Sequence, residues 1–209
     1  MTLQTYSVVS RALTVVAVIV AMATGAWAQT ETIIHTFTGG SDGGIPFGGL
    51  IIDGKGNLYG TTVTGGVGTY CQCGTVFQLV PGSNGTWTKN ILYSFSSSSN
   101  LSDGLSPQGL LVLDGKGNLY GTAAAGGTGA GLVFKLSPGS SGTWTETTLY
   151  SFAGGSDGES PSSGVAFDGK GNLYGAAYGG TAGYDCFRTG QRECWDMDKK
   201  DAVQLYRHQ

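Results

Sequence analysis

The feature that most constrains the fold of this chain is an internal repeat. The eight residues Asp-Gly-Lys-Gly-Asn-Leu-Tyr-Gly occur three times, beginning at Asp53, Asp114 and Asp168. The repeat has a period of about 57 residues, which is the length of one supersecondary unit. A unit of this size buries its apolar face against its neighbours, so the sequence predicts a tandem array.

Other motifs recur in step with this one. A Tyr-Ser-Phe motif ends the units, and His35-Thr36-Phe37 is its counterpart near the N-terminus. We therefore predict β-propeller-like repeats across residues 29–184, with units at about 34–91 and 92–148 and a truncated one at 149–184. The further recurrences are Gly-Gly-Ser-Asp-Gly at Gly39 and Gly154, with Ser102-Asp103-Gly104 as a degenerate copy, Val-Phe-Gln-Leu at Val76, Val-Phe-Lys-Leu at Val133, Gly-Thr-Trp-Thr at Gly85 and Gly142, and Tyr-Ser-Phe at Tyr93 and Tyr150.

Each unit contains four short extended segments, as a propeller blade does. In the first unit they are residues 50–53, 58–62, 75–80 and 86–95, separated by turns rich in Gly, Asn and Ser. The 38 glycines and the 12% of charged residues are typical of short strands joined by tight turns. The predicted fold class is all-β, with four short antiparallel strands per blade and an incomplete ring. In the last segment, alternation predicts one shared face for Trp87, Lys89, Ile91, Tyr93 and Phe95.

Residues 1–28 have the pattern of a secretory signal peptide. Arg11 lies in a short n-region, an apolar run extends from Leu13 to Met22, and Ala26-Trp27-Ala28 precedes Gln29. We predict cleavage after Ala28, and a mature chain that is secreted or lies in the periplasm or cell envelope without a membrane span. The alternative is an uncleaved N-terminal anchor.

The Asp-Gly-Lys-Gly-Asn turns have a structural interpretation. Asp53 is placed to accept hydrogen bonds from backbone N–H groups ahead of it, and Gly56 and Asn57 tolerate positive φ. A calcium loop needs more oxygen ligands than the single carboxylate that each turn supplies. The aspartates of the Ser-Asp-Gly turns have the same interpretation, with ligand contact at one end of the array as the alternative: Asp42, Asp103 and Asp157.

The remaining candidates do not predict a metal, a cofactor or a catalytic residue. Cys71 and Cys73 are spaced either to chelate a metal or to close a local disulfide, but there is no second ligand pair, and His35 and His208 are isolated. The 11 basic residues are scattered and the net charge is −3, which argues against a nucleic-acid partner. P-loop, nucleophile-elbow and dinucleotide-binding motifs are missing.

The last 25 residues, 185–209, differ from the repeats because they contain 10 charged residues and one glycine. A polar terminal segment and a capping element are two explanations. A third is a frameshift near Tyr184, because reverse-translating residues 185–206 and reading one nucleotide later, with permitted codon choices, yields a half-repeat matching Thr75 to Phe95. In that frame Trp195-Asp196 forces Gly and Met197-Asp198 forces Trp, where the repeat requires them. This hypothesis predicts an aberrant, poorly ordered tail that leaves the third blade without its two outer strands, and a chain truncated from a larger propeller.

The order of these motifs from residue 33 to residue 184 resembles the GloVer tandem-repeat family of exported bacterial proteins. The resemblance implies propellers of many blades, often with a C-terminal surface anchor, and it implies no enzymatic activity and no catalytic residue for the repeat. This chain has too few repeats to close a ring and no recognisable anchor.

We therefore predict a non-enzymatic exported binding or structural scaffold with an unknown envelope or extracellular ligand, a glycan being the class considered. The alternative is a carbohydrate-binding or carbohydrate-active propeller, which would use paired carboxylates or sugar-stacking aromatic residues. The acidic residues outside the shared turns are Glu31, Glu146 and Glu159. The aromatic candidates recur regularly, which favours core packing: Trp87, Trp144, Tyr59, Tyr120 and Tyr174.

Overall fold

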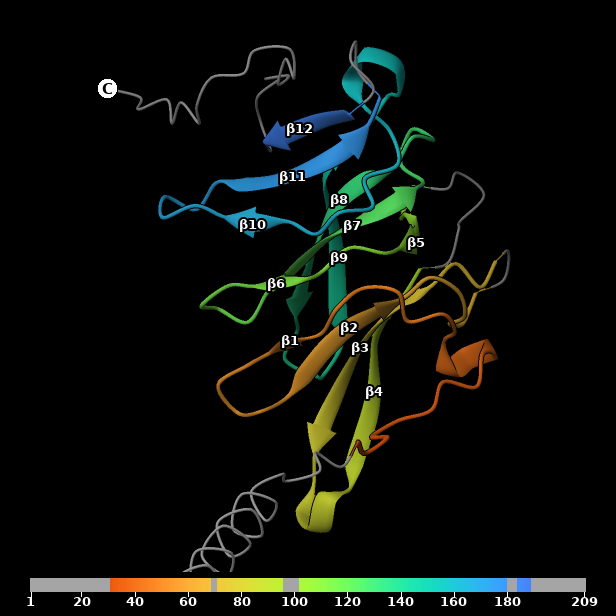
Figure 1. Ribbon diagram of the computed structural model, residues 1–209, viewed down its shortest axis with the longest axis vertical. Helices are drawn as coiled ribbons and strands as arrows, with labels where there is room; N and C mark the ends of the chain where they lie inside the picture. The colour runs from red at the N-terminus through yellow and green to blue at the C-terminus, as the bar shows by residue number, and fades with distance from the viewer. Residues whose placement is uncertain (1–30, 69–70, 96–101, 180–183, 189–209) are drawn as a thin grey trace, which may run out of the picture. The chain divides into compact units, whose positions relative to one another are not determined.

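The computed structural model describes residues 31–68, 71–95, 102–179 and 184–188. The chain divides into two compact units, residues 1–34 and residues 35–209, and the sheets below all belong to the second. This part is all-β, as predicted, with three antiparallel sheets and short 3-10 turns (Figure 1). In the described ranges no helix is long and apolar enough to cross a membrane. The predicted signal peptide, residues 1–28, lies outside the described residues.

The first sheet has the four strands predicted for a propeller-like blade, and they lie in sequence order. The 3-10 turn η1 (Gly40–Asp42) precedes it and η2 (Ser83–Gly85) joins its last two strands. Its strands pair antiparallel with their sequence neighbours, and their bounds are β1 (Ile51–Ile52), β2 (Leu58–Thr62), β3 (Thr75–Pro81) and β4 (Trp87–Ser94).

The second and third sheets repeat this order. In the second sheet two short strands, β5 (Leu105–Pro107) and β6, both pair with the long strand β7. The 3-10 turn η3 (Gly155–Asp157) precedes the third sheet, as η1 precedes the first. The remaining strands are β6 (Val112–Leu113), β7 (Leu119–Ala125), β8 (Leu132–Pro138), β9 (Trp144–Ser151), β10 (Ala166–Phe167), β11 (Leu173–Tyr178) and β12 (Tyr184–Arg188).

Strand β12 corrects one expectation about the tail. The third blade was predicted to lack both outer strands, but β12 pairs with β11 from Tyr184 to Arg188, so the third strand is present. Phe187 lies opposite Gly175 in this pairing. The tail keeps an aromatic residue at the register position where the other blades have one, and backbone pairing tolerates the changed neighbours. Residues 189–209 lie outside the described residues.

A phenylalanine of the third strand crosses a glycine of the second strand in the first two blades. Phe77 lies opposite Gly60 and Phe134 lies opposite Gly121. Both rings are buried, and a Cβ at Gly121 would lie 2.7 Å from Cζ of Phe134. The glycine of the Leu-Tyr-Gly motif is therefore required by close packing of the ring.

Successive blades share their cores. Phe95, which follows β4 of the first blade, packs edge to face on Phe134 of the second at 5.2 Å between ring centroids. Phe152, which follows β9, lies in a cluster with Val165 and Leu173 of the third blade. Each Tyr-Ser-Phe motif therefore places its phenylalanine in the next blade, which explains why the motif ends every unit.

The outer strand of each of the first two blades contains a β-bulge that the sequence did not predict. Val76 pairs with Tyr93 but Phe77 pairs with Ile91, so Leu92 is an extra residue on β4. The same shift recurs in β9 of the second blade. The predicted common face for Ile91 and Tyr93 is therefore wrong, because the bulge reverses the alternation, and Ile91 is 38% exposed.

Candidate functional site

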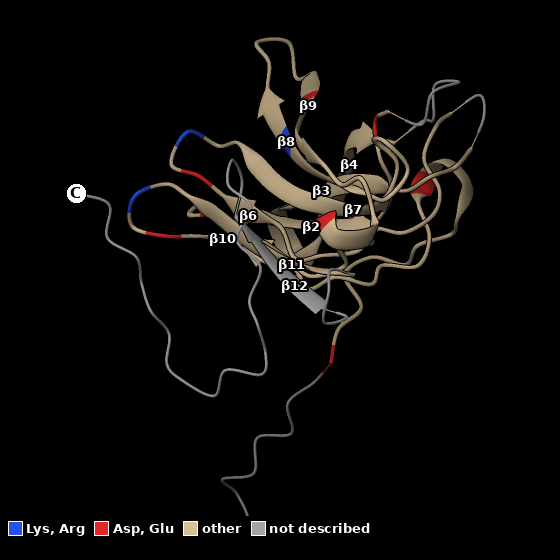
Figure 2. Cartoon of the chain, turned by 90° about the horizontal axis from the view of Figure 1, so that it is seen from above, with Lys and Arg blue, Asp and Glu red and all other residues tan. Residues whose placement is uncertain are grey.

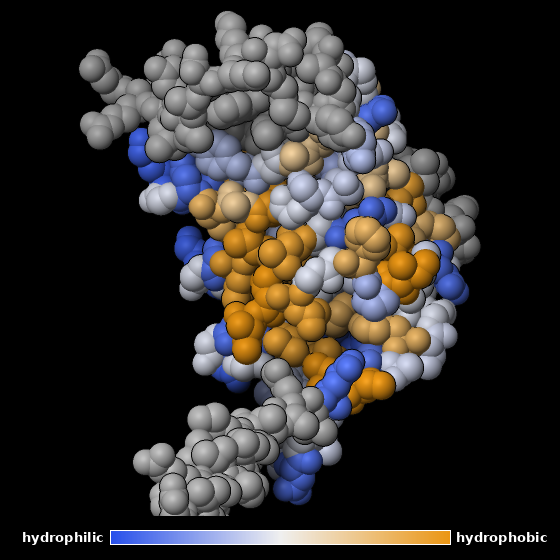
Figure 3. Space-filling view, in the orientation of Figure 1, coloured by the Kyte–Doolittle hydropathy of each residue, from blue (hydrophilic) through white to orange (hydrophobic). Residues whose placement is uncertain are grey.

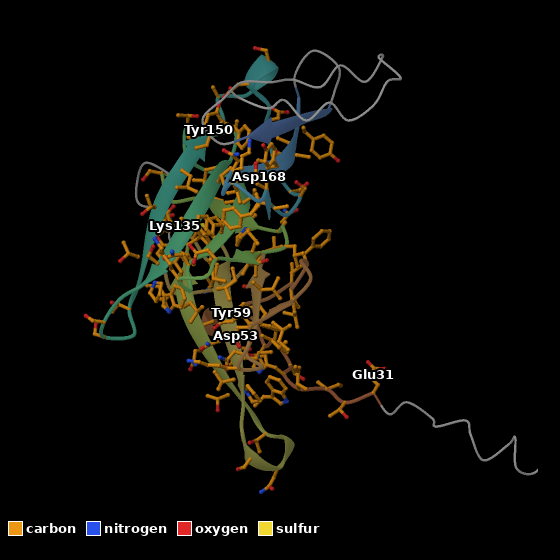
Figure 4. All side chains as sticks on the ribbon, turned by 90° about the vertical axis from the view of Figure 1, so that its left-hand side faces the viewer. Glu31, Asp53, Tyr59, Lys135, Tyr150 and Asp168 are labelled. Atoms are coloured by element: carbon orange, nitrogen blue, oxygen red, sulfur yellow. A yellow bond between two sulfur atoms is a disulfide. The ribbon has the colours of Figure 1, made fainter. Side chains whose placement is uncertain are left out.

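The carboxylates of the Asp-Gly-Lys-Gly-Asn turns are fully used by the fold. Oδ1 of Asp53 accepts hydrogen bonds from the backbone N–H groups of Lys55 (2.8 Å) and Asn57 (2.9 Å). Oδ2 accepts from Nδ2 of Asn57 (2.8 Å) and from the hydroxyl of Tyr59 (3.0 Å; Figure 4). A carboxylate has about four acceptor positions, so the turn leaves none for a calcium ion. The structural interpretation of the turn is confirmed.

The other two turns have the same four bonds, formed by Asp114 and Asp168. Burial opposes the charged form of Asp114, but the hydrogen bonds from Asn118 outweigh it and lower its pKa to about 2. Gly56 has φ of 83°, whereas Asn57 does not have a positive φ. The predicted backbone role of Asn57 is wrong, since its side-chain amide serves the aspartate instead.

The aspartates of the Ser-Asp-Gly turns join consecutive units. Each accepts a hydrogen bond from the ring that begins the preceding Tyr-Ser-Phe motif or its counterpart. The structural interpretation was preferred for these aspartates, with ligand contact as the alternative, and the structure places them at the blade junctions. The pairs are His35 Nε2 with Asp42 Oδ1 (3.2 Å), Tyr93 with Asp103 Oδ2 (3.1 Å) and Tyr150 with Asp157 Oδ1 (2.5 Å).

In the first blade this junction also contains a buried ammonium group. Nζ of Lys89 lies 2.8 Å from Oδ1 of Asp42, and the lysine side chain is 7% exposed. The same nitrogen lies 4.5 Å from the ring centroid of Phe37 and 5.6 Å from that of Phe77. The hydrogen bond from Lys89 holds the pKa of Asp42 well below its ordinary value.

The second blade has a glutamate where the first has this lysine. Glu146 pairs with Leu136 as Lys89 pairs with Leu79. The surrounding rings also correspond, because Phe95 and Phe134 lie 5.2 Å apart at 63°, and the first blade's pair lies 5.0 Å apart at the same angle. A carboxylate therefore takes the place of an ammonium group in an equivalent frame.

Glu146, Asp103 and Tyr93 form the candidate functional site. Burial and the charge of Asp103 raise the pKa of Glu146 to about 6, against a hydrogen bond of 3.2 Å from Oγ1 of Thr148. Burial and the charges of Asp103 and Glu146 also raise the pKa of Tyr93. A carboxylic acid with a raised pKa beside a second carboxylate is typical of acid–base chemistry and of cation binding.

In the sequence analysis Glu146 was paired with no other acidic residue, so this site was not predicted. Aligning Lys89 with Glu146 across the two units would have shown a charge reversal opposite an aspartate that recurs. Glu159 lies elsewhere, bridged through its backbone to Tyr178, and Glu31 is exposed.

The recurring aromatic residues divide into buried and exposed members. Tyr59 is 6% exposed, and Trp144 packs against the first core cluster, so core packing is confirmed for both. Tyr120 packs edge to face on Phe167 at 4.9 Å. Tyr174 is 39% exposed, more than its buried equivalent Tyr59, and its hydroxyl donates a hydrogen bond to Oδ2 of Asp168 (3.3 Å).

An apolar surface lies along the first blade and continues onto the second. Figure 3 shows hydrophobic side chains gathered there, and Figure 2 shows that charged side chains lie mainly at turns. Gly49 borders Leu110, with 3.1 Å between its Cβ position and Cδ1. Surfaces of this kind mark interaction sites. Its members are Ile45 (59% exposed), Phe47 (70%), Leu50 (48%), Ile52 (67%) and Leu110 (43%).

Cys71 and Cys73 form a disulfide with each other, which is one of the two alternatives for this pair. The other is a metal chelate, which requires free thiolates. The carbonyl of Cys73 accepts a hydrogen bond from the N–H of Ser106 (2.8 Å), which links this loop of the first blade to the second blade. His35 contacts Asp42 and is not isolated, and His208 lies outside the described residues. Over the described ranges, no three His, Cys, Asp or Glu side chains gather as a metal site would require.

The three equivalent sheets, the shared turns and the aromatic–aspartate junctions define an all-β tandem-repeat protein of the propeller-like class. The chain belongs to the family described as the Gloeobacter/Verrucomicrobia repeat, whose pattern matches residues 10–188. This confirms the resemblance to the GloVer repeats. A comparison with curated proteins gives no match.

Proposed function

We propose that the protein is an exported, non-enzymatic repeat scaffold of the cell envelope or extracellular space that binds a ligand at positions where its blades differ. The observation that carries this proposal is the use of the recurring carboxylates by the fold. Asp53 and its equivalents accept four hydrogen bonds each, and Asp157 and its equivalents hold the blade junctions. The shared polar residues therefore form the scaffold, and the residues that differ between equivalent positions of the blades determine ligand specificity.

Export is tested by expressing the whole chain in a Gram-negative host and fractionating the cells. The expected result is a periplasmic or secreted protein whose mass and N-terminal peptide begin at Gln29. A protein retained in the cytosol with residues 1–28 intact would contradict export. A membrane-bound protein that keeps those residues would instead support the uncleaved anchor.

Binding without turnover is tested on the mature chain with a panel of cell-surface polysaccharides and peptidoglycan fragments. Bound ligand and released reducing ends are measured in the same samples. A non-enzymatic scaffold gives no release above a heat-denatured control, whether or not a panel member binds. Release that follows protein concentration would overturn the proposal.

The second candidate is a carbohydrate-binding or carbohydrate-active propeller, and two observations favour it. Glu146 has a raised pKa beside Asp103, the arrangement in which a carboxylic acid donates a proton to a glycosidic oxygen. Tyr174 and Tyr178 are 39% and 48% exposed on strand β11, where alternation places both on one face for stacking on a sugar.

Matched variants separate these roles. Glu146→Gln removes the acid with little change in volume, and Glu159→Gln, at an exposed position, is its control. A carbohydrate-active protein would lose turnover in the first variant alone. A lectin would lose saturable binding in Tyr174→Ala and Tyr178→Ala but keep it in Phe47→Ala, which removes an aromatic residue that is 70% exposed on the apolar surface.

A further inference from the structure

Residues 30–37 have the sequence of an outer strand of a blade. Thr-Glu-Thr-Ile-Ile-His-Thr-Phe aligns without gaps to residues 145–152, Thr-Glu-Thr-Thr-Leu-Tyr-Ser-Phe, with identity at both Thr positions, the Glu and the Phe. The segment also aligns without gaps to residues 88–95, Thr-Lys-Asn-Ile-Leu-Tyr-Ser-Phe. Those two segments contain β4 and β9, which are the fourth strands of their sheets. The Asp-Gly-Lys-Gly-Asn turn of an inner hairpin does not occur before residue 30.

The end of this segment is held on the first blade as β4 is held on the second. His35 contacts Asp42 at 3.2 Å, in the place of the tyrosine–aspartate junctions. The rings of His35 and Phe37 lie 4.7 Å apart at 86°, and those of the Tyr-Ser-Phe motifs lie 5.0 Å apart at 78° and 79°. Phe37 packs on Phe77 as Phe95 packs on Phe134. Residues 35–37 therefore occupy the position of an outer-strand end.

The rest of the segment differs from β4 because it has no strand partner among the described residues. Residues 31–38 belong to no sheet, and Ile33 is 77% exposed, whereas its equivalent Ile91 is 38% exposed. An extended apolar segment with unpaired backbone groups is a template for pairing with another chain. Since its end lies on the first blade, its remaining residues belong to a sheet that would precede that blade.

Strand β12 of the third sheet provides a matching edge. In the first blade the equivalent strand β3 pairs with β4 through Val76 with Tyr93 and Phe77 with Ile91. Gly175 pairs with Phe187 as Gly60 pairs with Phe77, so the repeat register extends to β12. The described part of the third sheet ends at β12, with the order β10-β11-β12.

We propose that residues 30–37 add as the fourth strand to β12 of a second copy of this chain. The second blade shares a core cluster with the first and packs against the third through another, so the third sheet follows the second blade along the array. The segment belongs before the first blade, and a second copy supplies that position. Two copies joined this way at both ends bring together six of the described sheets, and closed propellers have four to eight blades. The contact is heterologous, joining the first blade of one copy to the third of the other.

The register predicts which residues meet. By equivalence with Thr75 and Ser94, Asp185 of one copy lies opposite Thr36 of the other. Cysteines placed at these two positions, with Cys186 and Cys194 changed to Ser, are expected to form disulfide-linked dimers after mild oxidation. Mixing a Thr36→Cys protein with an Asp185→Cys protein gives the same linked pair only between copies. The control pairs Thr36→Cys with Arg188→Cys, about 10 Å further along the strand, and gives little product.

The native association is tested by light scattering during gel filtration of the mature chain. The expected mass is twice that of the monomer. Successive N–H groups of an edge strand point alternately toward its partner and toward solvent, so of the two single variants Thr32→Pro and Ile33→Pro one removes a donor to β12 and halves the mass. Val67→Asp, at a residue 68% exposed elsewhere, leaves the dimer intact. A monomeric wild-type protein, or a cross-link formed within one chain, would overturn the proposal, and circular dichroism checks that every variant is folded.

Discussion

Replacing Gly121 with alanine tests the close packing that makes the Leu-Tyr-Gly motif recur. Gly121 lies in β7 opposite Phe134, and its backbone is not in the positive-φ region. An added Cβ would lie 2.7 Å from Cζ of Phe134 and 2.8 Å from Cδ2 of Leu111. Ordinary contact begins at 3.4 Å, so the ring and the leucine must each move by roughly 0.6 to 0.7 Å. Both are fully or almost fully buried, and a close-packed core has little space for such a shift.

The magnitude follows from two opposing effects. Overpacking a core costs about 1–3 kcal/mol, and the reduced freedom of alanine in the unfolded chain returns about 0.4–1 kcal/mol. The difference spans about 0–2.6 kcal/mol, so we expect Gly121→Ala to lower the free energy of unfolding by about 1.3 kcal/mol, the middle of that range. The control is Gly115→Ala, where nothing lies within 4 Å of the added Cβ and φ is not positive, so that change is neutral or slightly stabilising.

Urea unfolding followed by tryptophan fluorescence and circular dichroism measures both variants. A third variant, Phe134→Leu, removes the end of the ring, and in that background the alanine has room. The two changes should therefore be less costly together than the sum of their separate costs, with a coupling of about 0.5–2 kcal/mol. If Gly121→Ala were as harmless as Gly115→Ala, or if the two changes were additive, the ring contact would not explain the glycine.

Four further changes test the junctions, the candidate site and the disulfide. Glu146 has a folded-state pKa raised to about 6, so its protonated form stabilises the fold fully below pH 4.5, and this stabilisation is lost as the pH rises through 6. The melting temperature should therefore fall over this pH range, and Glu146→Gln should abolish the fall. Glu146→Lys should raise the melting temperature at pH 7 by placing an ammonium group beside Asp103, as in the first blade. Tyr150→Phe removes the hydroxyl that donates to Asp157, and urea unfolding should show a loss of about 1.5–3 kcal/mol. Cys71→Ser opens a very short disulfide loop, so it should cost about 1–2 kcal/mol and make the melting temperature insensitive to reductant.

The repeat made most of the fold predictable, since strand positions and turn chemistry follow from local sequence. The bulge at Leu92 was not predictable, because it depends on how β4 meets β3 and alternation within one strand does not record an inserted residue. The role of Asn57 was also hidden: a turn aspartate and an asparagine four residues later suit several geometries, and only the fold shows the amide reaching the carboxylate.

The candidate site was harder to predict because its members are distant in sequence. Asp103 lies just before β5, at one end of the second blade's sequence, and Glu146 lies in β9, at the other end. Only the folded sheet brings their charges together. The aromatic–aspartate junctions were hidden for a different reason: their members lie only 7 to 10 residues apart in recurring motifs, but only the fold shows that the loop brings the ring onto the carboxylate. Tertiary proximity across about 40 residues leaves no local pattern to detect.

A repeat array provides its own comparison, because one structural position is occupied by different residues in equivalent surroundings. Lys89 and Glu146 share a register position, a pair of phenylalanine rings and a neighbouring aspartate, yet they carry opposite charges. The fold therefore does not require either charge there. In the first blade the lysine neutralises the aspartate, and in the second two acids face each other with one pKa near 6. Since the scaffold tolerates the ion pair of the first blade, the cost of the acidic arrangement needs a cause outside the scaffold, and we propose that ligand binding at Glu146 is that cause.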